Sequence, residues 1–118
     1  MNREEVRELV NLVRFEGEDI AALIERARTV SAGLIEEVVY LTRADAADIL
    51  IKFLAGEFSA DDFSEWAEAV HGLDTIGAEE GYDDLLIQFI FEISTPELFC
   101  EVNEETGKYW LDEIKRSL

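Results

Sequence analysis

The chain has little of the histidine and cysteine that acid–base, nucleophilic and metal sites commonly use, because its 118 residues include one histidine and one cysteine. Glu68 and His71 have the i, i+3 spacing with which carboxylate-bridged di-iron bundles hold their metals, but that architecture requires a second such pair on another helix. The sequence has no second histidine. We therefore interpret His71 as an ordinary histidine near a helix end and expect no metal site.

Two other patterns that could indicate chemistry are incomplete. Residues 74–85 have roughly the length of a calcium-binding loop, but Glu79 stands where glycine is required and Leu85 where glutamate is required. Cys100 lies in an apolar segment without a basic residue nearby to activate it, so a buried and unreactive thiol is expected. A glycine-rich phosphate-binding loop is also missing. The sequence therefore predicts no catalytic residues and no cofactor.

Carboxylates are the abundant functional group, and they are concentrated in one stretch. Residues 53–107 contain fifteen Asp and Glu side chains and no Lys or Arg, so they carry −15 of the formal net charge of −18. Exposed acids usually form a solvated surface. Like charges at i, i+4 on a helix repel, however, and no basic residue of this stretch offsets Asp61, Glu65 and Glu68. A surface that retains this repulsion suggests attraction of a cationic partner.

The charge balance also limits the class of partner. A sequence pI near 4.1 argues against direct binding to nucleic acid or to an anionic membrane, since phosphate groups attract clusters of Lys and Arg. We expect a basic protein instead, and we expect the loop acids to contribute more than the helix acids. The candidate contact residues are Asp61, Glu65, Glu68, Asp74, Glu79, Glu80, Asp83 and Asp84.

Length and composition predict one folded domain spanning residues 1–118. With 48% apolar residues, 10% aromatics and one proline, the chain is too hydrophobic for a disordered acidic tail. A single cysteine cannot form an internal disulfide. The first ten residues, MNREEVRELV, have neither the apolar core of a signal peptide nor a membrane span. We therefore expect a cytoplasmic protein, and we expect it to be a monomer.

Apolar periodicity and capping residues predict helices along most of the chain. Asn2, Thr42, Ser59 and Asn103 are the expected N-caps, and Gly17 and Gly56 the expected stops. In the helix after Ser59, the core face is expected to consist of Phe63, Trp66, Ala67 and Val70. The predicted fold is an all-α bundle of six or seven helices.

Four segments carry less decisive patterns. Residues 34–41, LIEEVVYL, suit a short helix or a β-branched strand, and the helical neighbours favour helix. Residues 83–94 form the most hydrophobic segment and are expected to be a central helix, with a buried strand as the alternative. Residues 72–82 are expected to be an irregular, mobile loop because of their glycines and acids. Thr95 and Pro96 are expected to start a helical turn or two that reaches Cys100.

A longer pattern carries a family resemblance. The run Phe53-Leu54-x-Gly56-x-x-Ser59-x-x-x-Phe63-x-x-Trp66-Ala67 precedes a glycine-rich acidic loop, an aromatic helix and the pair Pro96-Glu97. This arrangement resembles bacterial immunity proteins that accompany contact-dependent growth inhibition toxins and, more distantly, the helical immunity proteins of tRNA-cleaving colicins. The similarity covers the chain from about Thr42 to the C-terminus.

The resemblance implies a cytosolic protein that binds the toxic C-terminal domain of a secreted effector and blocks its active site. Such toxins are often nucleases with basic substrate clefts, which agrees with the independent charge argument. The residues that match the family pattern are core positions, so no binding residue is transferred. The alternative hypothesis is an acidic regulatory or adaptor module that mimics nucleic acid or docks a basic DNA-binding protein.

Overall fold

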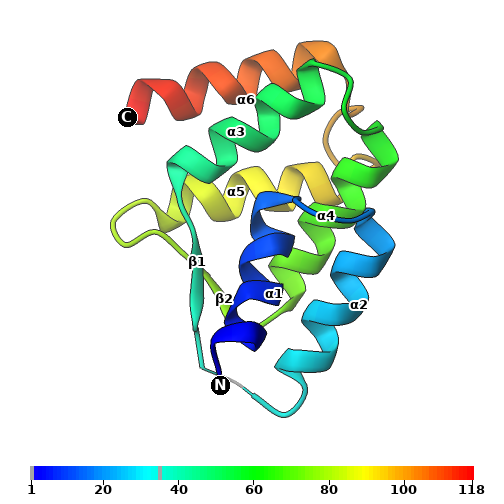
Figure 1. Ribbon diagram of the computed structural model, residues 1–118. Coiled ribbons are helices and arrows are strands. Elements are labelled where there is room, and N and C mark those ends of the chain that lie inside the picture. Colours follow the sequence, from blue (N-terminus) through cyan, green and yellow to red (C-terminus); the bar gives the residue numbers. More distant parts are fainter. Residues whose placement is uncertain (1, 35) are drawn as a thin grey trace.

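The computed structural model describes residues 2–34 and 36–118. These residues form six helices and two three-residue strands, joined by turns and loops (Figure 1). The expected fold class is confirmed: the chain forms a single, mostly helical globule, to which a small parallel sheet is added. The elements in chain order are α1 (Arg3–Arg14), α2 (Ile20–Ser31), β1 (Val39–Leu41), α3 (Arg43–Leu54), α4 (Ala60–Gly72), β2 (Ile76–Ala78), α5 (Asp83–Ser94) and α6 (Glu104–Ser117).

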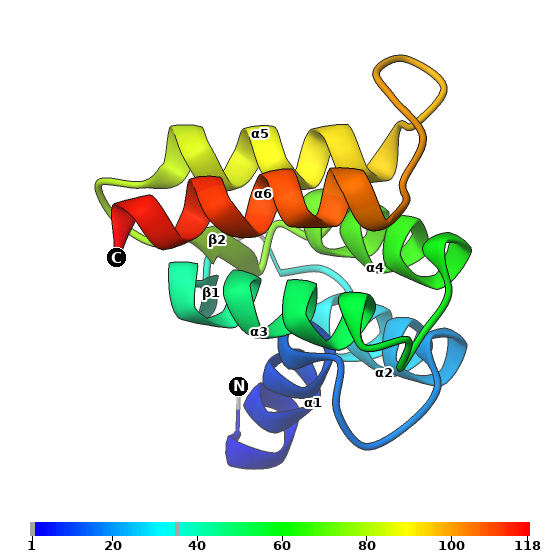
Figure 2. The same ribbon diagram turned by 90° about the horizontal axis from the view of Figure 1, so that it is seen from above.

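The helices pack in three close pairs, α1 with α2, α3 with α6, and α4 with α5. In Figure 2, α3 lies between α6 and the α1–α2 pair, and α5 lies beyond α6. The pairing of α3 with α6 joins segments that are far apart in sequence. Gly107 on α6 allows the two helices to approach closely, because it has no side chain. A Cβ atom at this position would lie 3.0 Å from Leu54 Cδ2 and 3.2 Å from Phe53 Cδ2.

The predicted N-caps are confirmed. The side chains of Asn2, Thr42, Ser59 and Asn103 each accept a hydrogen bond, 2.9–3.1 Å long, from the backbone amide three residues later. Each bond satisfies one of the amides that a helix start leaves without an intrahelical partner. The predicted end of the first helix at Gly17 is wrong by a few residues. The helix α1 ends at Arg14, because Phe15 takes the left-handed conformation with φ 53°.

An aromatic cluster forms the centre of the core. Ring centroids are 5.8 Å apart for Phe63 and Trp66, 6.3 Å for Trp66 and Phe89, and 5.5 Å for Phe89 and Trp110. The expected core face of α4 is confirmed, since Phe63, Trp66 and their apolar neighbours are buried. The Trp66 indole N–H donates a 2.8 Å hydrogen bond to the Leu12 carbonyl, so burial leaves no indole donor unsatisfied.

The helix expected for residues 34–41 is wrong, and so is the irregular loop expected for all of 72–82. The two segments pair as parallel strands, with Val39 opposite Ile76, Tyr40 opposite Gly77 and Leu41 opposite Ala78. Ile35, which the expected helix included, lies outside the described residues. The alternation of buried Val39, exposed Tyr40 and buried Leu41 suits a strand with one covered face.

Residues 95–99 form isolated turns instead of the expected helical restart. The Leu98 and Phe99 amides each donate to the carbonyl three residues earlier, at 3.0 and 3.3 Å, and no helix continues from these bonds. Cys100 follows them and is exposed, so the expectation of a buried thiol is wrong. The apolar residues around Cys100 in sequence therefore do not bury it.

The expectation that residues 83–94 form a helix is confirmed, because this segment is α5. Its inner face buries Leu86, Phe89, Ile90 and Ile93. At 12 residues α5 is far shorter than the roughly 20 residues that a bilayer span requires. Within residues 2–34 and 36–118, no helix has both the length and the apolar character needed to cross a membrane.

The burial of Trp66 predicts a large effect on stability. Trp66→Ala should lower the free energy of unfolding by about 3 to 5 kcal/mol, because it removes a fully buried side chain and leaves a cavity. Urea unfolding followed by circular dichroism measures this change. Leu98→Ala is the control, since Leu98 is largely exposed and its loss should change stability by less than about 0.5 kcal/mol. Equal effects of the two substitutions would contradict the central position of Trp66.

Candidate functional site

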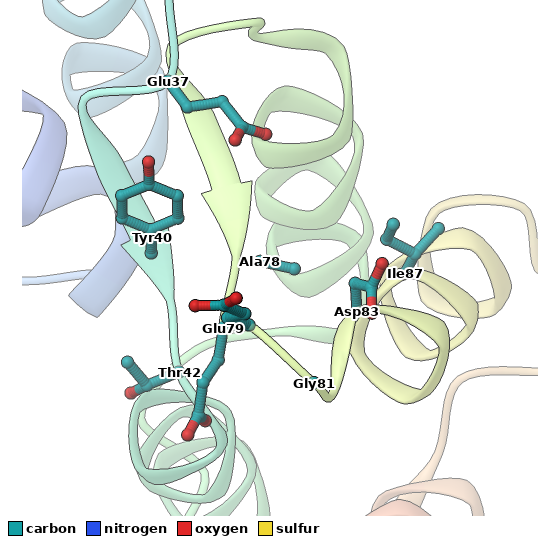
Figure 3. Close-up of a pocket in the computed structure, with 9 residues that line it drawn as sticks. Glu37, Tyr40, Thr42, Ala78, Glu79, Gly81, Asp83 and Ile87 are labelled. Atoms are coloured by element: carbon teal, nitrogen blue, oxygen red, sulfur yellow. The ribbon is translucent and has the colours of Figure 1, made fainter.

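An open groove of about 800 Å³ lies beside the strands, where the chain enters α5 (Figure 3). We call it the acidic groove, because four of its nine lining residues are Asp or Glu. Three segments that are distant in sequence meet at this groove: the residues around β1, the end of β2 with the loop after it, and the first turns of α5. Its lining consists of Glu37, Tyr40, Thr42, Ala78, Glu79, Glu80, Gly81, Asp83 and Ile87.

The small parallel sheet builds one wall of the acidic groove. Tyr40 and Gly77 are opposite each other in the register, on the face away from buried Val39 and Leu41. Gly77 leaves room for Glu37, since a Cβ atom on Gly77 would lie 2.6 Å from Glu37 Cδ. Figure 3 shows the Glu37 side chain reaching from the β1 side toward β2. The absence of a side chain at Gly77 thus allows a carboxylate to lie at the groove wall.

Arg43 and Glu79 form a polar cluster at the other end of the acidic groove. The Arg43 backbone amide and Nε donate to Glu79 Oε1 at 2.9 and 3.1 Å, and Nη2 donates to Oε2 at 3.0 Å. The guanidinium carbon lies 3.6 Å from the centre of the Tyr82 ring, and Nη1 donates to the Ser117 carbonyl. This cluster connects the start of α3, the loop after β2 and the end of α6.

The hydrogen bonds from Arg43 hold the pKa of Glu79 below the ordinary glutamate value. The same bonds raise the pKa of Arg43. Both side chains are therefore charged at neutral pH, and each neutralises the other. Glu79, one of the predicted contact residues, therefore carries a charge that Arg43 neutralises within the protein. Glu79 is a positioning residue that holds the loop carrying Glu80.

The other predicted loop acids are not all in one place. Glu80 and Asp83 line the acidic groove. Asp84 is exposed on the first turn of α5, next to Asp83, but does not line the groove. Asp74 is exposed in the turn before β2, whereas Glu80 follows β2, so the strand separates the two. The structure thus brings Glu80 and Asp83 together and leaves Asp74 outside.

The predicted helix acids belong to a different surface. Glu65 and Glu68 line a separate groove between α2 and α4, and Arg28 of α2 lines the same groove. Asp61 is exposed in the first turn of α4 and lines neither groove. Glu25 of α2 lines this groove as well, so one cation faces three carboxylates there. Glu80 and Asp83 are the better candidates, because the exposed Tyr40 and Ile87 line the same groove as these two acids.

The metal and nucleophile candidates are not assembled into a site. His71 is exposed at the end of α4, and its ring centroid lies 6.1 Å from that of Phe91. Among the described residues, no group of three or more His, Cys, Asp or Glu side chains is arranged to hold a metal ion. Cys100 and Tyr109 line one surface depression, and His71 lines another.

Of the nine residues that line the acidic groove, sequence reasoning proposed Glu79, Glu80 and Asp83 as contacts and missed six. Glu37, Tyr40 and Ile87 are the missed residues with a charged or large apolar side chain. The helix expected for 34–41 concealed Glu37 and Tyr40, although the alternation from Val39 to Leu41 was a signal for a strand with Tyr40 facing outward. Ile87 is 49% exposed on α5. Its position away from the buried face of α5 was visible in the helical periodicity, so its exposure could have been expected.

Comparison with family models, curated proteins and solved structures found no match for this chain. The resemblance to toxin-immunity proteins stays a sequence-based expectation.

The Arg43–Glu79 cluster predicts a specific dependence of stability on pH. The lowered pKa of Glu79 means that the ion pair stabilises the fold above the ordinary glutamate pKa. This contribution is lost as pH falls from about 4.3 through the lowered value. The difference in free energy of unfolding between wild type and Glu79→Gln should therefore be largest near neutral pH and shrink in acid. Urea unfolding across pH measures it.

The matched control for this prediction is Glu80→Gln. It removes one carboxylate from the neighbouring position, where no hydrogen bond to Arg43 is present. Its stability should follow wild type throughout the pH range. A Glu79→Gln protein as stable as wild type at neutral pH would contradict the positioning role of the cluster.

Proposed function

We propose that this protein is an immunity protein that neutralises the basic toxic domain, a nuclease domain for example, of a secreted bacterial effector. Inhibition would be stoichiometric, with the acidic groove occluding the positively charged site of the toxin. The observation that carries the proposal is the charge of the groove, whose carboxylates at 37, 80 and 83 form no ion pair with a residue of 2–34 or 36–118. Glu37, Glu80 and Asp83 line it, while Arg43, which reaches the same region, is paired with Glu79.

The composition of the groove supports a protein as the partner. Tyr40 and Ile87 are about half exposed and lie beside the carboxylates. Protein interfaces combine apolar and aromatic contacts with a polar, charged rim in this way. The lining residues come from the strand region on one side and from the start of α5 on the other (Figure 3), and the groove between them is open to solvent, so a side chain or surface of a partner domain can enter it.

Charge would act mainly on the rate of association. An excess of carboxylates steers a basic partner through solvent and raises the association rate by a factor of about 10 to 1,000. Ions screen this attraction with a Debye length of about 8 Å at physiological salt. A basic nuclease cleft satisfies the complementarity and would lose access to its substrate when covered. An acidic regulator would attract a basic partner in the same way. The two functions are therefore distinguished by the identity of the partner, a toxin or a DNA-binding protein.

The direct test uses the gene immediately upstream of this one. If that gene encodes a large secreted protein, its basic C-terminal domain should arrest bacterial growth when expressed inside cells. Co-expression of this protein should restore growth, and the purified pair should form a 1:1 complex by size-exclusion chromatography. A non-toxic domain, or a toxic domain that forms no complex, would reject the immunity function. A DNA-binding protein as upstream neighbour and binding partner would favour the regulatory alternative.

The same pair of proteins tests the acidic groove. Replacing Glu80 and Asp83 together by Lys should slow association about tenfold or more at low salt and flatten its salt dependence. The unfolding midpoint should stay nearly unchanged or rise slightly, because crowded negative charge is relieved. The matched control replaces Glu65 and Glu68 by Lys, which changes net charge equally on the other groove. Stopped-flow rates that fall equally in both variants would show that net charge alone, and not the acidic groove, controls association.

A further inference from the structure

A group of exposed apolar side chains follows α5. Nine large hydrophobic residues are exposed among those described, and four of them lie on α5 or in the turns after it, while Tyr40 on β1 lines the acidic groove together with Ile87 of α5. Scattered exposed apolar residues are normal, but a contiguous group on a monomer marks an interaction surface. We call this group the apolar strip, and it consists of Tyr40, Ile87, Phe91, Leu98 and Phe99.

The apolar strip is continuous with the acidic groove. Tyr40 and Ile87 both line the groove. Ile87 also lines an adjoining small cavity of about 150 Å³ with His71, whose ring lies 6.1 Å from that of Phe91. Phe91 in turn meets Phe99 edge to face, with 5.3 Å between centroids. The strip therefore starts at the carboxylates, follows α5 and ends at the turns after it, where Leu98 is 67% exposed.

The charge around the apolar strip decides among its conceivable occupants. Glu37, Glu80 and Asp83 lie at its groove end, and residues 53–107 provide no Lys or Arg. A second copy of this chain would bring a further formal charge of −18 against the first. An anionic lipid surface would be repelled in the same way. An occupant that buries the strip must therefore combine apolar side chains with Lys or Arg.

The geometry favours a helix as the shape of that occupant. Ile87 and Phe91 are four residues apart on α5, so their side chains lie one turn apart on the same helix face. A helix that lays an apolar stripe against such a ridge presents its own anchors at the matching spacing of one turn. Extra basic residues at one end of that helix would reach the carboxylates of the groove.

We infer that the apolar strip and the acidic groove together bind a basic amphipathic helix of the partner protein. This inference deepens the proposed function by naming the part of the partner that is recognised. The apolar face of the helix covers Ile87, Phe91 and Phe99, and its Lys and Arg residues meet Glu80 and Asp83. Apolar contacts then hold the complex and control dissociation, whereas the carboxylates guide association.

The test titrates the isotope-labelled protein with two synthetic peptides and follows backbone amide shifts by NMR. One peptide, built of Leu, Lys and Ala, places all leucines on one face of a helix. The other has the same composition in scrambled order. The amphipathic peptide should bind more tightly and shift the amides of Ile87, Phe91 and Phe99, while the scrambled peptide should shift only those near Glu80 and Asp83. Equal affinities, or shifts outside the strip, would overturn the inference.

Ile87→Ser should weaken binding of the amphipathic peptide about tenfold and leave the scrambled peptide unaffected. Ile51→Ser is the matched control, because Ile51 is 47% exposed on α3 and does not belong to the strip. Equal effects of both substitutions would overturn the inference. These titrations use no toxin. If the peptide binds the apolar strip but the protein does not neutralise the toxin, only the immunity function is rejected. Neutralisation that is insensitive to Ile87→Ser would retain immunity and reject the bound helix.

Discussion

The acidic groove depends on one ion pair, that between Arg43 and Glu79. Three hydrogen bonds join the two side chains and the Arg43 amide, and the guanidinium also stacks on Tyr82 and contacts the last turn of α6. Backbone hydrogen bonds from the Glu79 amide to the Leu41 carbonyl and from the Tyr82 amide to the Glu79 carbonyl also hold the loop between β2 and α5. The hydrogen bonds from Arg43 fix the Glu79 side chain at the start of this loop, next to Glu80, and neutralise its charge. The same interaction therefore shapes the groove and defines its charge.

The fold redistributes the charge that the sequence concentrates in residues 53–107. Arg43, from the N-terminal half, pairs with Glu79 of this stretch, and Arg28 and Glu25 of α2 line the same groove as Glu65 and Glu68. Net charge alone therefore does not show which carboxylates are available to a partner. After this redistribution, unpaired acids and exposed apolar side chains coincide at the acidic groove and the apolar strip. This coincidence favours specific protein recognition over a merely solubilising surface.

Features that depend on local sequence were predictable, and features that depend on distant segments were not. The caps at Thr42 and Ser59 and the buried face of α4 follow from residue spacings within one helix. The β1–β2 pair needs two segments separated by two helices, and helical neighbours outweighed the strand alternation at residues 39–41. Glu79 was identifiable as a loop acid, but its pairing with Arg43 is likewise non-local. Glu37 and Tyr40 were missed from the candidate site for the same reason.

We propose that the acidic groove and the apolar strip together form the partner-binding surface. Hydrogen–deuterium exchange of this protein, alone and with the basic domain encoded upstream, is the most direct test of that surface. We expect slower exchange in the complex for residues 37–42 and 79–91, with exchange in 61–68 unchanged. Protection confined to residues 61–68 and the α2–α4 groove, or no protection in a stable complex at residues 37–42 and 79–91, would contradict it.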